Sequence, residues 1–257
     1  MSSISLGRSS TRGVCFAFAS ALLTCAVVAS GCGRPTIADE SKSPSQVTDF
    51  TQLYERNCSG CHGADGKFGP APPLNDTLFL EIIPEAEFLR TVREGRKGTL
   101  MPAFARKSGG TLTDEQISII ALGVRNLWAK PVDIPRATIP DYLPPADAQA
   151  APSQANVEAG QQVFAKACAG CHGERGDGGQ MAGPLRNASF LSLISDQALR
   201  RIVITGRADL EMPNFVTLGK TLNDGKPLTS AQIADVVALL ASWRTSDEPA
   251  KAAAATQ

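Results

Sequence analysis

The sequence predicts an all-α protein with two similar halves, on three observations. Apolar residues recur at helical spacing between helix start and stop signals. No convincing alternating pattern of the kind that strands require is present. The chain also repeats itself once, since the segment that begins at Cys58 returns at Cys168. Two copies are too few for a solenoid, so the repeat indicates tandem domains.

The repeat extends well beyond the cysteines. The offset is 110 residues at Cys58 and Cys168, and one inserted residue then increases it to 111. The further matches are Pro73-Leu74 with Pro184-Leu185, Phe79-Leu80 with Phe190-Leu191, Arg90 with Arg201, Gly95-Arg96 with Gly206-Arg207, Met101-Pro102 with Met212-Pro213, and Phe104 with Phe215.

Each copy is expected to contain three main helices in the same order. A first helix runs into the first cysteine of its copy. A middle helix over about 85–94, or about 196–205, stops at a glycine, the residue preferred just after a helix. A last helix begins with a capping box, in which a threonine and a glutamine three residues later cap each other's backbone. The residues that carry these signals are Phe50, Leu53, Tyr54, Gly95, Thr113 and Gln116 in the first copy, and Val157, Val163, Phe164, Gly206, Thr229 and Gln232 in the second.

The N-terminus has the pattern of a bacterial export signal. Arg8 and Arg12 precede an uncharged apolar stretch over 14–30, which ends in small residues before Cys32. Ala-Ser-Gly-Cys resembles the lipobox, which predicts lipidation of Cys32 and a membrane anchor. Plain secretion and an uncleaved anchor remain alternatives, although the stretch is short for the roughly 30 Å of hydrocarbon that a spanning helix crosses.

The expected organisation follows from these features. Six prolines between residues 129 and 155 disfavour regular helix and favour an extended, semi-rigid connection. The expected parts are a signal peptide over 1–31, a lipid-anchored tether over 32–47, domain 1 over 48–130, a Pro-rich linker over 131–155, domain 2 over 156–245 and a tail over 246–257.

Composition limits the functions that the chain can have. It holds 25 basic and 25 acidic residues, so it lacks the basic excess of a nucleic-acid-binding protein. Aromatic residues make up only 5%, which is little for packing two small cores. Such domains need another source of buried apolar contact, such as a cofactor or disulfides.

The sequence Cys-x-x-Cys-His, at 58–62 and again at 168–172, is the attachment motif of c-type haem. Two thiols at this spacing reach the two vinyl groups on one porphyrin edge, and the adjacent imidazole becomes the proximal iron ligand. The predicted attachment residues are Cys58, Cys61, His62, Cys168, Cys171 and His172. A zinc ribbon would place its cysteine pairs closer together, and a thioredoxin-like motif needs a βαβ setting. Disulfides would not require the histidines, and these are the two histidines of the chain.

The remaining cysteines are accounted for without a disulfide or a catalytic thiol. Of the seven, four are assigned to haem, Cys15 and Cys25 leave with the signal, and Cys32 is lipidated.

Methionine is the expected distal ligand, because both histidines are used proximally. Met101 lies 39 residues after His62 and Met212 lies 40 after His172, and each is followed by proline. This length lets the chain pass around the haem and approach its opposite face. Met181 is only nine residues after its histidine and is expected to be a loop or core residue.

Each copy resembles a class I c-type cytochrome domain, and the mature chain resembles the two-domain dihaem cytochromes c. The resemblance covers about 48–130 and 156–245 and implies two haem c groups. It also implies that a loop proline carbonyl accepts a hydrogen bond from the proximal histidine, a role that falls on Pro73 and Pro184. Arg96 and Arg207 match a position near the haem propionates, with a solvated surface role as the alternative.

The resemblance implies single-electron transfer on the periplasmic side of a bacterial membrane. Two six-coordinate irons would leave no open position for a small-molecule substrate, so the expected partners are a redox donor and acceptor. The chain would act as a carrier or as the cytochrome subunit of a respiratory complex. The alternatives are a dihaem enzyme, such as a peroxidase or thiosulfate dehydrogenase, and a haem-based sensor with a labile methionine.

Overall fold

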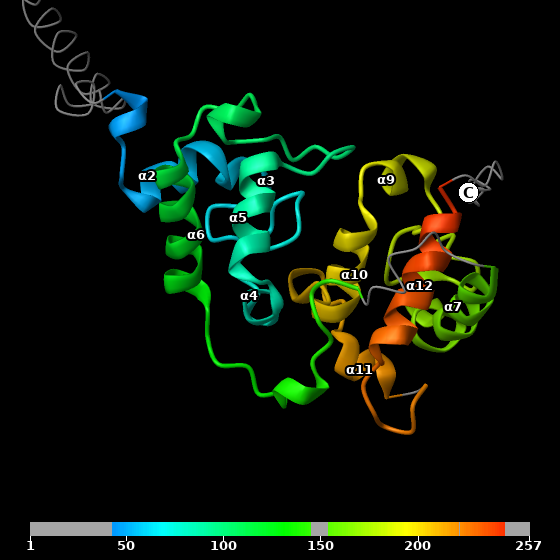
Figure 1. The fold of residues 1–257 in the computed structure, drawn as a ribbon. Coiled ribbons are helices and arrows are strands. Elements are labelled where there is room, and N and C mark those ends of the chain that lie inside the picture. The colour runs from blue at the N-terminus through cyan, green and yellow to red at the C-terminus, as the bar shows by residue number, and fades with distance from the viewer. Residues whose placement is uncertain (1–42, 145–153, 221, 245–257) are drawn as a thin grey trace, which may run out of the picture. The chain divides into compact units, whose positions relative to one another are not determined.

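The computed structural model describes residues 43–144, 154–220 and 222–244, which form helices and turns (Figure 1). Within these ranges the β-structure consists of two isolated bridges, Ala105 with Leu112 and Arg207 with Met212. The all-α prediction is therefore confirmed. The predicted signal peptide, Cys32, and the tail over 246–257 lie outside the described residues. The chain divides into two compact units at Pro44, and the elements below belong to the second unit, apart from the first residue of a short 3₁₀ helix, η1 (Pro44–Gln46).

The described first half contains five α-helices that position its site. The helix α2 (Phe50–Asn57) leads into the short α3 (Ser59–His62), and α4 (Thr77–Ile82) is followed by α5 (Glu85–Glu94). After the 3₁₀ turn η2 (Arg106–Ser108), α6 (Asp114–Trp128) completes the half. The predicted middle helix is thus confirmed at the residues expected, and it ends at Gly95.

The second half repeats the order of the α-helices but has its 3₁₀ turn before Met212 and an additional short helix, α11, after it. It consists of α7 (Gln154–Ala167), α8 (Ala169–His172), α9 (Ala188–Ser192), α10 (Asp196–Thr205), η5 (Ala208–Leu210), α11 (Phe215–Gly219) and α12 (Ser230–Ser242). The middle helix of this half, α10, ends at Gly206 as predicted. Both predicted capping boxes are present, with Thr113 and Gln116 starting α6 and Thr229 and Gln232 starting α12.

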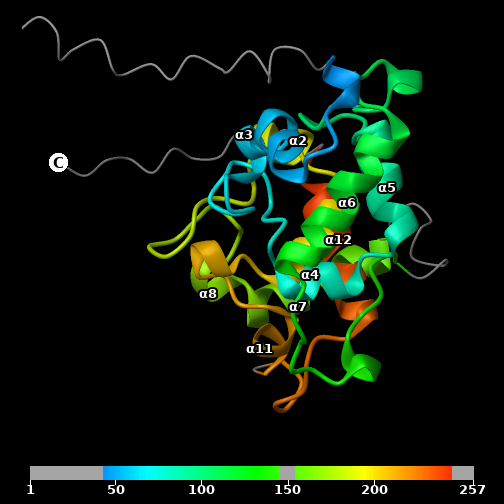
Figure 2. The ribbon, with the colours of Figure 1, turned by 90° about the vertical axis from the view of Figure 1, so that its left-hand side faces the viewer.

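In each half the first and last helices pack against each other (Figures 1 and 2). The crossing needs a glycine, because a Cβ at Gly160 of α7 would lie 2.2 Å from the carbonyl oxygen of Asp235 in α12. In the first half Gly123 of α6 lies against the ring of Phe50. The absence of a side chain at these glycines lets the helix axes approach closely, and in each half this crossing involves the helix that leads into the cysteine motif.

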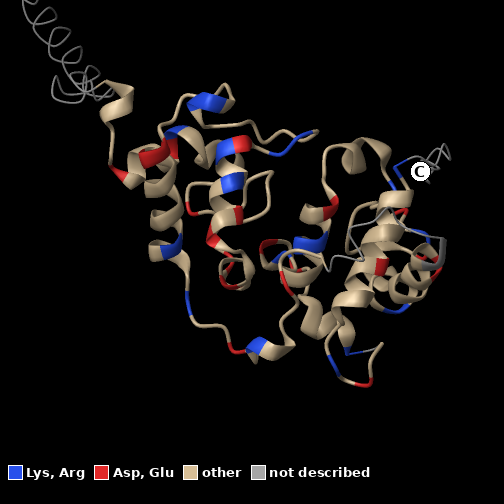
Figure 3. Ribbon diagram, viewed as in Figure 1, with Lys and Arg blue, Asp and Glu red and all other residues tan. Residues whose placement is uncertain are grey.

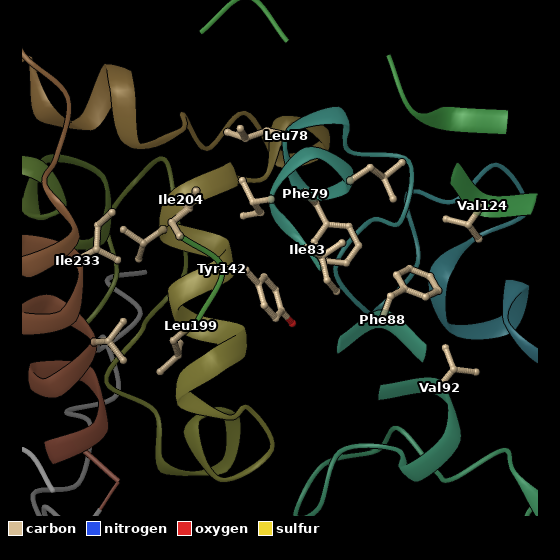
Figure 4. Close-up of a cluster of buried hydrophobic side chains, with 14 of the residues drawn as sticks. Leu78, Phe79, Ile83, Phe88, Val92, Val124, Tyr142, Leu199, Ile204 and Ile233 are labelled. Carbon is tan, nitrogen blue, oxygen red and sulfur yellow. The ribbon is translucent and has the colours of Figure 1, made fainter. Parts of the chain in front are cut away.

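The described part of the Pro-rich connection packs into the core as well as joining the two halves. It contains one 3₁₀ turn, η3 (Arg136–Thr138), and it buries Ile139 and Tyr142. Figure 4 shows Tyr142 between Phe79 and the apolar residues of α10. Its ring centre lies 6.3 Å from that of Phe79, and Gln197 of α10 donates a hydrogen bond to its carbonyl oxygen at 2.7 Å. The connection therefore contributes to the buried core.

Acidic and basic residues alternate over both halves (Figure 3), in agreement with the balanced composition. Among the described residues, no helix combines the length and the hydropathy that a membrane crossing requires.

Candidate haem-attachment sites

The two cysteine motifs lie at equivalent places in the fold. Each starts at the residue that ends the first helix and continues through one short helical turn, α3 or α8 (Figure 2). Cys58 and Cys168 have nearly the same backbone angles, with φ of −120° and −122°. Within each turn the histidine N–H donates to the carbonyl of the first cysteine, at 2.9 Å for His62 and 3.0 Å for His172. The helical turn places both thiols and the imidazole together.

The thiols of each pair lie in different surroundings. Cys58 is buried, whereas Cys61 is exposed. Burial, and secondarily the nearby Cys61, raises the pKa of the Cys58 thiol to about 12. Burial in the same way, with Cys171 as the second cause, raises the pKa of Cys168 to about 12. Thiols with raised pKa values are poor thiolate nucleophiles, so these positions do not suit disulfide exchange at neutral pH.

The histidines of the two motifs are held by loop carbonyls, but one residue earlier than expected. His62 Nδ1 lies 2.9 Å from the carbonyl oxygen of Pro72, and His172 Nδ1 lies 3.2 Å from that of Gly183. The expected acceptors, Pro73 and Pro184, are the residues that follow. Since a carbonyl only accepts, Nδ1 carries the hydrogen in each bond and Nε2 presents its lone pair. This tautomer is the one that a metal-binding imidazole needs.

The one-residue correction has a physical reason. The loop is closed by a leucine N–H that donates to a glycine carbonyl, Leu74 to Gly66 at 2.8 Å and Leu185 to Gly176 at 2.9 Å. In both loops the acceptor lies two residues before that leucine. The proline between them restricts the preceding residue to an extended conformation. Pro73 and Pro184 therefore fix the conformation of the acceptor residue instead of providing the acceptor.

The two methionine loops repeat the same backbone geometry. Arg96 N–H donates to the carbonyl of Met101 at 3.0 Å, and Arg207 N–H donates to that of Met212 at 3.0 Å. Each loop lies against the glycine that ends the preceding helix. A Cβ at Gly95 or Gly206 would lie 2.6 or 2.5 Å from the methionine carbonyl oxygen. Both glycines have positive φ, 69° and 70°, so the structure explains why glycine occupies these positions twice.

Aromatic residues behind each motif support it. Tyr54 and Trp128 form an edge-to-face pair with ring centres 5.2 Å apart, and Phe164 and Trp243 form the equivalent pair at 5.3 Å. Each tryptophan also contacts the loop that follows the histidine, at Gly66 or Gly176, where a Cβ would lie 2.8 or 2.7 Å from the indole ring. No motif in the sequence indicated a role for these tryptophans, although both lie at the end of the last helix of their half.

The other predicted residues have different environments in the two halves. Met181 is exposed on a loop. Arg96 donates to the Tyr142 hydroxyl at 2.9 Å, whereas Arg207 forms an ion pair with Asp209 at 2.8 Å. The guanidinium of Arg207 is thus already partly neutralised by a carboxylate, whereas that of Arg96 is bonded to a hydroxyl.

The donor set fits haem c. Each half provides two thiols one helical turn apart, an adjacent imidazole with Nε2 available, and a methionine loop anchored on a glycine. The helical fold, the tandem repeat and the paired motifs together define a dihaem c-type cytochrome with two domains.

The family is shown by comparison with known proteins. The model of cytochrome c oxidase, cbb3-type, subunit III matches residues 45–122 and again residues 155–240. The chain belongs to this family, and the double match agrees with two haem c groups.

Similar curated proteins agree with this family. The chain is 28% identical over 189 residues to the cbb3-type cytochrome c oxidase subunit CcoP of Azospirillum sp. (strain B510), covering 66% of this chain and 55% of that protein. It is 30% identical over 175 residues to the subunit FixP of Sinorhizobium medicae, covering 63% and 52%. The chain therefore spans about half the length of the curated relatives that it matches.

Proposed function

We propose that the chain transfers single electrons through two six-coordinate haems as the cytochrome subunit of a membrane oxidase complex. In this proposal Cys58 and Cys61 attach the first haem, and His62 and Met101 are its axial ligands. Cys168, Cys171, His172 and Met212 do the same for the second. The observation that carries the proposal is the repetition, in both halves, of the histidine–carbonyl bond and of the methionine loop packed on a glycine.

The chain itself contributes by holding the proposed axial ligands in fixed orientations. The bound haem supplies an iron that exchanges one electron between ferric and ferrous states. The carbonyls of Pro72 and Gly183 orient the imidazoles and increase their basicity. Neutral methionine favours the ferrous state, which raises the reduction potential. Because the short turns and glycine contacts restrict movement, little reorganisation accompanies each transfer.

The role as a complex subunit is supported by the relatives, which are named as subunits of cbb3-type oxidases. Since the chain covers only about half of their length, the complex that it joins is part of the proposal. A free carrier is the other role that haem c supports. Purification of the native protein from membranes separates the two, because a subunit co-purifies with a cbb3-type cytochrome c oxidase at constant stoichiometry and a carrier does not.

The attachment to the membrane is a further part of the proposal, and it depends on the sequence around Cys32. Lipidation there would place the two domains at the periplasmic face. Substitution Cys32→Ala should abolish incorporation of labelled palmitate and release the protein from membranes. A variant that keeps the label and fractionates with membranes would contradict a lipid anchor at this residue.

Spectroscopy of the purified protein tests the electron-transfer assignment. We expect two haems per chain by pyridine haemochrome assay, both resistant to acid–acetone extraction. The ferric protein should show the weak far-red band of methionine ligation, and the ferrous protein should not bind carbon monoxide rapidly. Rapid binding at one haem would indicate an open iron and would favour an enzyme.

A further inference from the structure

Arg201, on α10 of the second half, has its guanidinium buried against the first half. The residue is 5% exposed. Its Nη2 donates to the carbonyl oxygen of Pro73, and its guanidinium carbon lies 3.4 Å from the centre of the Phe79 ring. Figure 3 shows the basic residues on α10, and Figure 4 shows Phe79 facing that helix across Tyr142. The side chain therefore joins the loop of the first site to the second half.

The charge of this guanidinium is not matched by an ion pair. Among the described residues no carboxylate lies within salt-bridge distance of Arg201, and its buried Nε has no hydrogen-bond partner. Asp76 acts on it only at longer range. Burial lowers the pKa of Arg201 to about 9, which still leaves it protonated at neutral pH. A buried, unneutralised cation is costly, so its position calls for an explanation.

The matching residues of the two halves do not make this contact in the reverse sense. Arg201 corresponds to Arg90, and Phe79 corresponds to Phe190. Arg90 is half exposed and paired with Glu87 at 2.5 Å, and Phe190 is exposed as well. The second half thus provides a buried cation to the first, whereas the matching residue of the first half, Arg90, stays half exposed. This asymmetry distinguishes the surroundings of the two haem-attachment sites, which are otherwise alike.

Arg201 lies close to the proximal ligand of the first site. Its acceptor, Pro73, directly follows Pro72, whose carbonyl binds His62. The charges of Arg201 and Arg96 both act on the imidazole of His62. The positive field therefore reaches the imidazole. At the second site the counterpart of Arg96 is the ion-paired Arg207.

The same loop has a second contact with the second half. The pKa of Asp209 is lowered mainly by hydrogen bonds from Arg207, and also by one from the backbone N–H of Phe68. Asp209 and its neighbour Ala208 line a pocket together with Phe68 and Pro73. Residues of the second half therefore contact the loop between the first motif and α4 at two points, Phe68 and Pro73.

We propose that Arg201 is a positioning residue for the first haem, supplied by the second half, which holds the Pro72–Pro73 segment and raises the reduction potential of that haem. The inference rests on the proposed ligation by His62 and Met101. The physical reason is electrostatic, because ferrous haem carries one positive charge fewer than ferric haem. A fixed nearby cation with limited solvent screening favours the reduced state.

The test is a potentiometric titration of the two-haem protein, with the first haem assigned through the spectral change that Met101→Ala causes. In Arg201→Gln, the reduced-to-oxidised ratio of the first haem at a fixed ambient potential should decrease by on the order of tenfold. The second haem should be unchanged. Arg201→Lys keeps the charge and should restore most of the ratio. Arg90→Gln, at the matching exposed position, should change neither haem.

A second variant covers the case in which Arg201→Gln does not accumulate with two haems. Asp76→Asn keeps the cap of α4, since asparagine also accepts from the Phe79 N–H, but it removes the negative charge that faces Arg201. The first haem should then become easier to reduce. Equal changes at both haems would overturn the inference, and so would the absence of any change in both Arg201→Gln and Asp76→Asn. A lysine variant that behaves like the glutamine variant would also overturn it. Absence of the far-red band from the wild-type protein would instead contradict the proposed ligation by methionine.

Discussion

Gly95 and Met101 are in backbone contact, with the Cα of the glycine turned toward the methionine carbonyl so closely that a Cβ would lie 2.6 Å from its oxygen. The same Cβ would lie 2.5 Å from the carbonyl carbon of Pro102. The end of α5 and the methionine loop therefore cannot move apart independently, and a substitution in one affects the other. Any substitution at Gly95 must displace the loop that carries the proposed ligand.

Gly95→Ala should accordingly reduce the far-red band of the first haem and lower the free energy of unfolding by about 1–3 kcal/mol, measured by denaturation of the ferric protein. Gly98→Ala is the matched control. Gly98 also has positive φ, 77°, but no atom lies within 4 Å of its added Cβ. It should show the backbone strain without the spectral change. Equal spectra for the two variants would contradict a link between Gly95 and the ligand loop.

The methionine variants test the two ligand assignments separately. Met101→Ala should convert only the first haem to a high-spin or ligand-accepting form, and Met212→Ala only the second, each with loss of about half of the far-red band. Met181→Ala is the control, because Met181 is exposed on a loop. If Met181→Ala removes the band while Met212→Ala leaves it intact, the assignment of the second distal ligand is wrong.

Asp76→Asn should stabilise the protein near neutral pH. Burial is the largest influence on Asp76 and raises the pKa of its carboxyl, while the hydrogen bond from Phe79, the charge of Arg201 and the hydrogen bond from Leu78 act against it. An acid with a raised folded-state pKa binds more protons when folded, so stability decreases as pH rises from the unfolded value of about 3.9 through the folded value. The advantage of the asparagine variant should therefore disappear below about pH 4. Urea denaturation at several pH values measures it, and an advantage independent of pH would show that charge is not its origin.

Gly160→Ala should destabilise the second half more than Gly123→Ala destabilises the first. At Gly160 the added Cβ meets the backbone of Asp235, so α7 and α12 must move apart, at a cost of about 1–3 kcal/mol. At Gly123 it meets the ring of Phe50, a side chain that can rotate. Thermal denaturation of the two variants gives the order, and the reverse order would mean that the α7–α12 crossing adjusts more readily than its backbone contact indicates.

Local features of this protein were predictable because they depend on neighbouring residues. The capping boxes at Thr113 and Thr229 and the stops at Gly95 and Gly206 each involve only a few successive positions, and all four are present. The attachment motif is equally local, since one helical turn places two thiols and an imidazole together. The carbonyl acceptors were displaced by one residue because the loop is closed through Gly66 and Gly176, a contact that the sequence does not display.

The sequence by itself determined the fold class, the tandem repeat and two equivalent motifs, because short-range periodicity and spacing encode them. It could not distinguish the two copies, since Arg90 and Arg201 are the same residue in matching segments. Only the tertiary structure decided that Arg201 is buried on Phe79 while Arg90 pairs with Glu87. It also placed Tyr142 of the connection in the core beside Phe79. Burial and charge pairing depend on which surfaces meet, and residues far apart in the chain determine that.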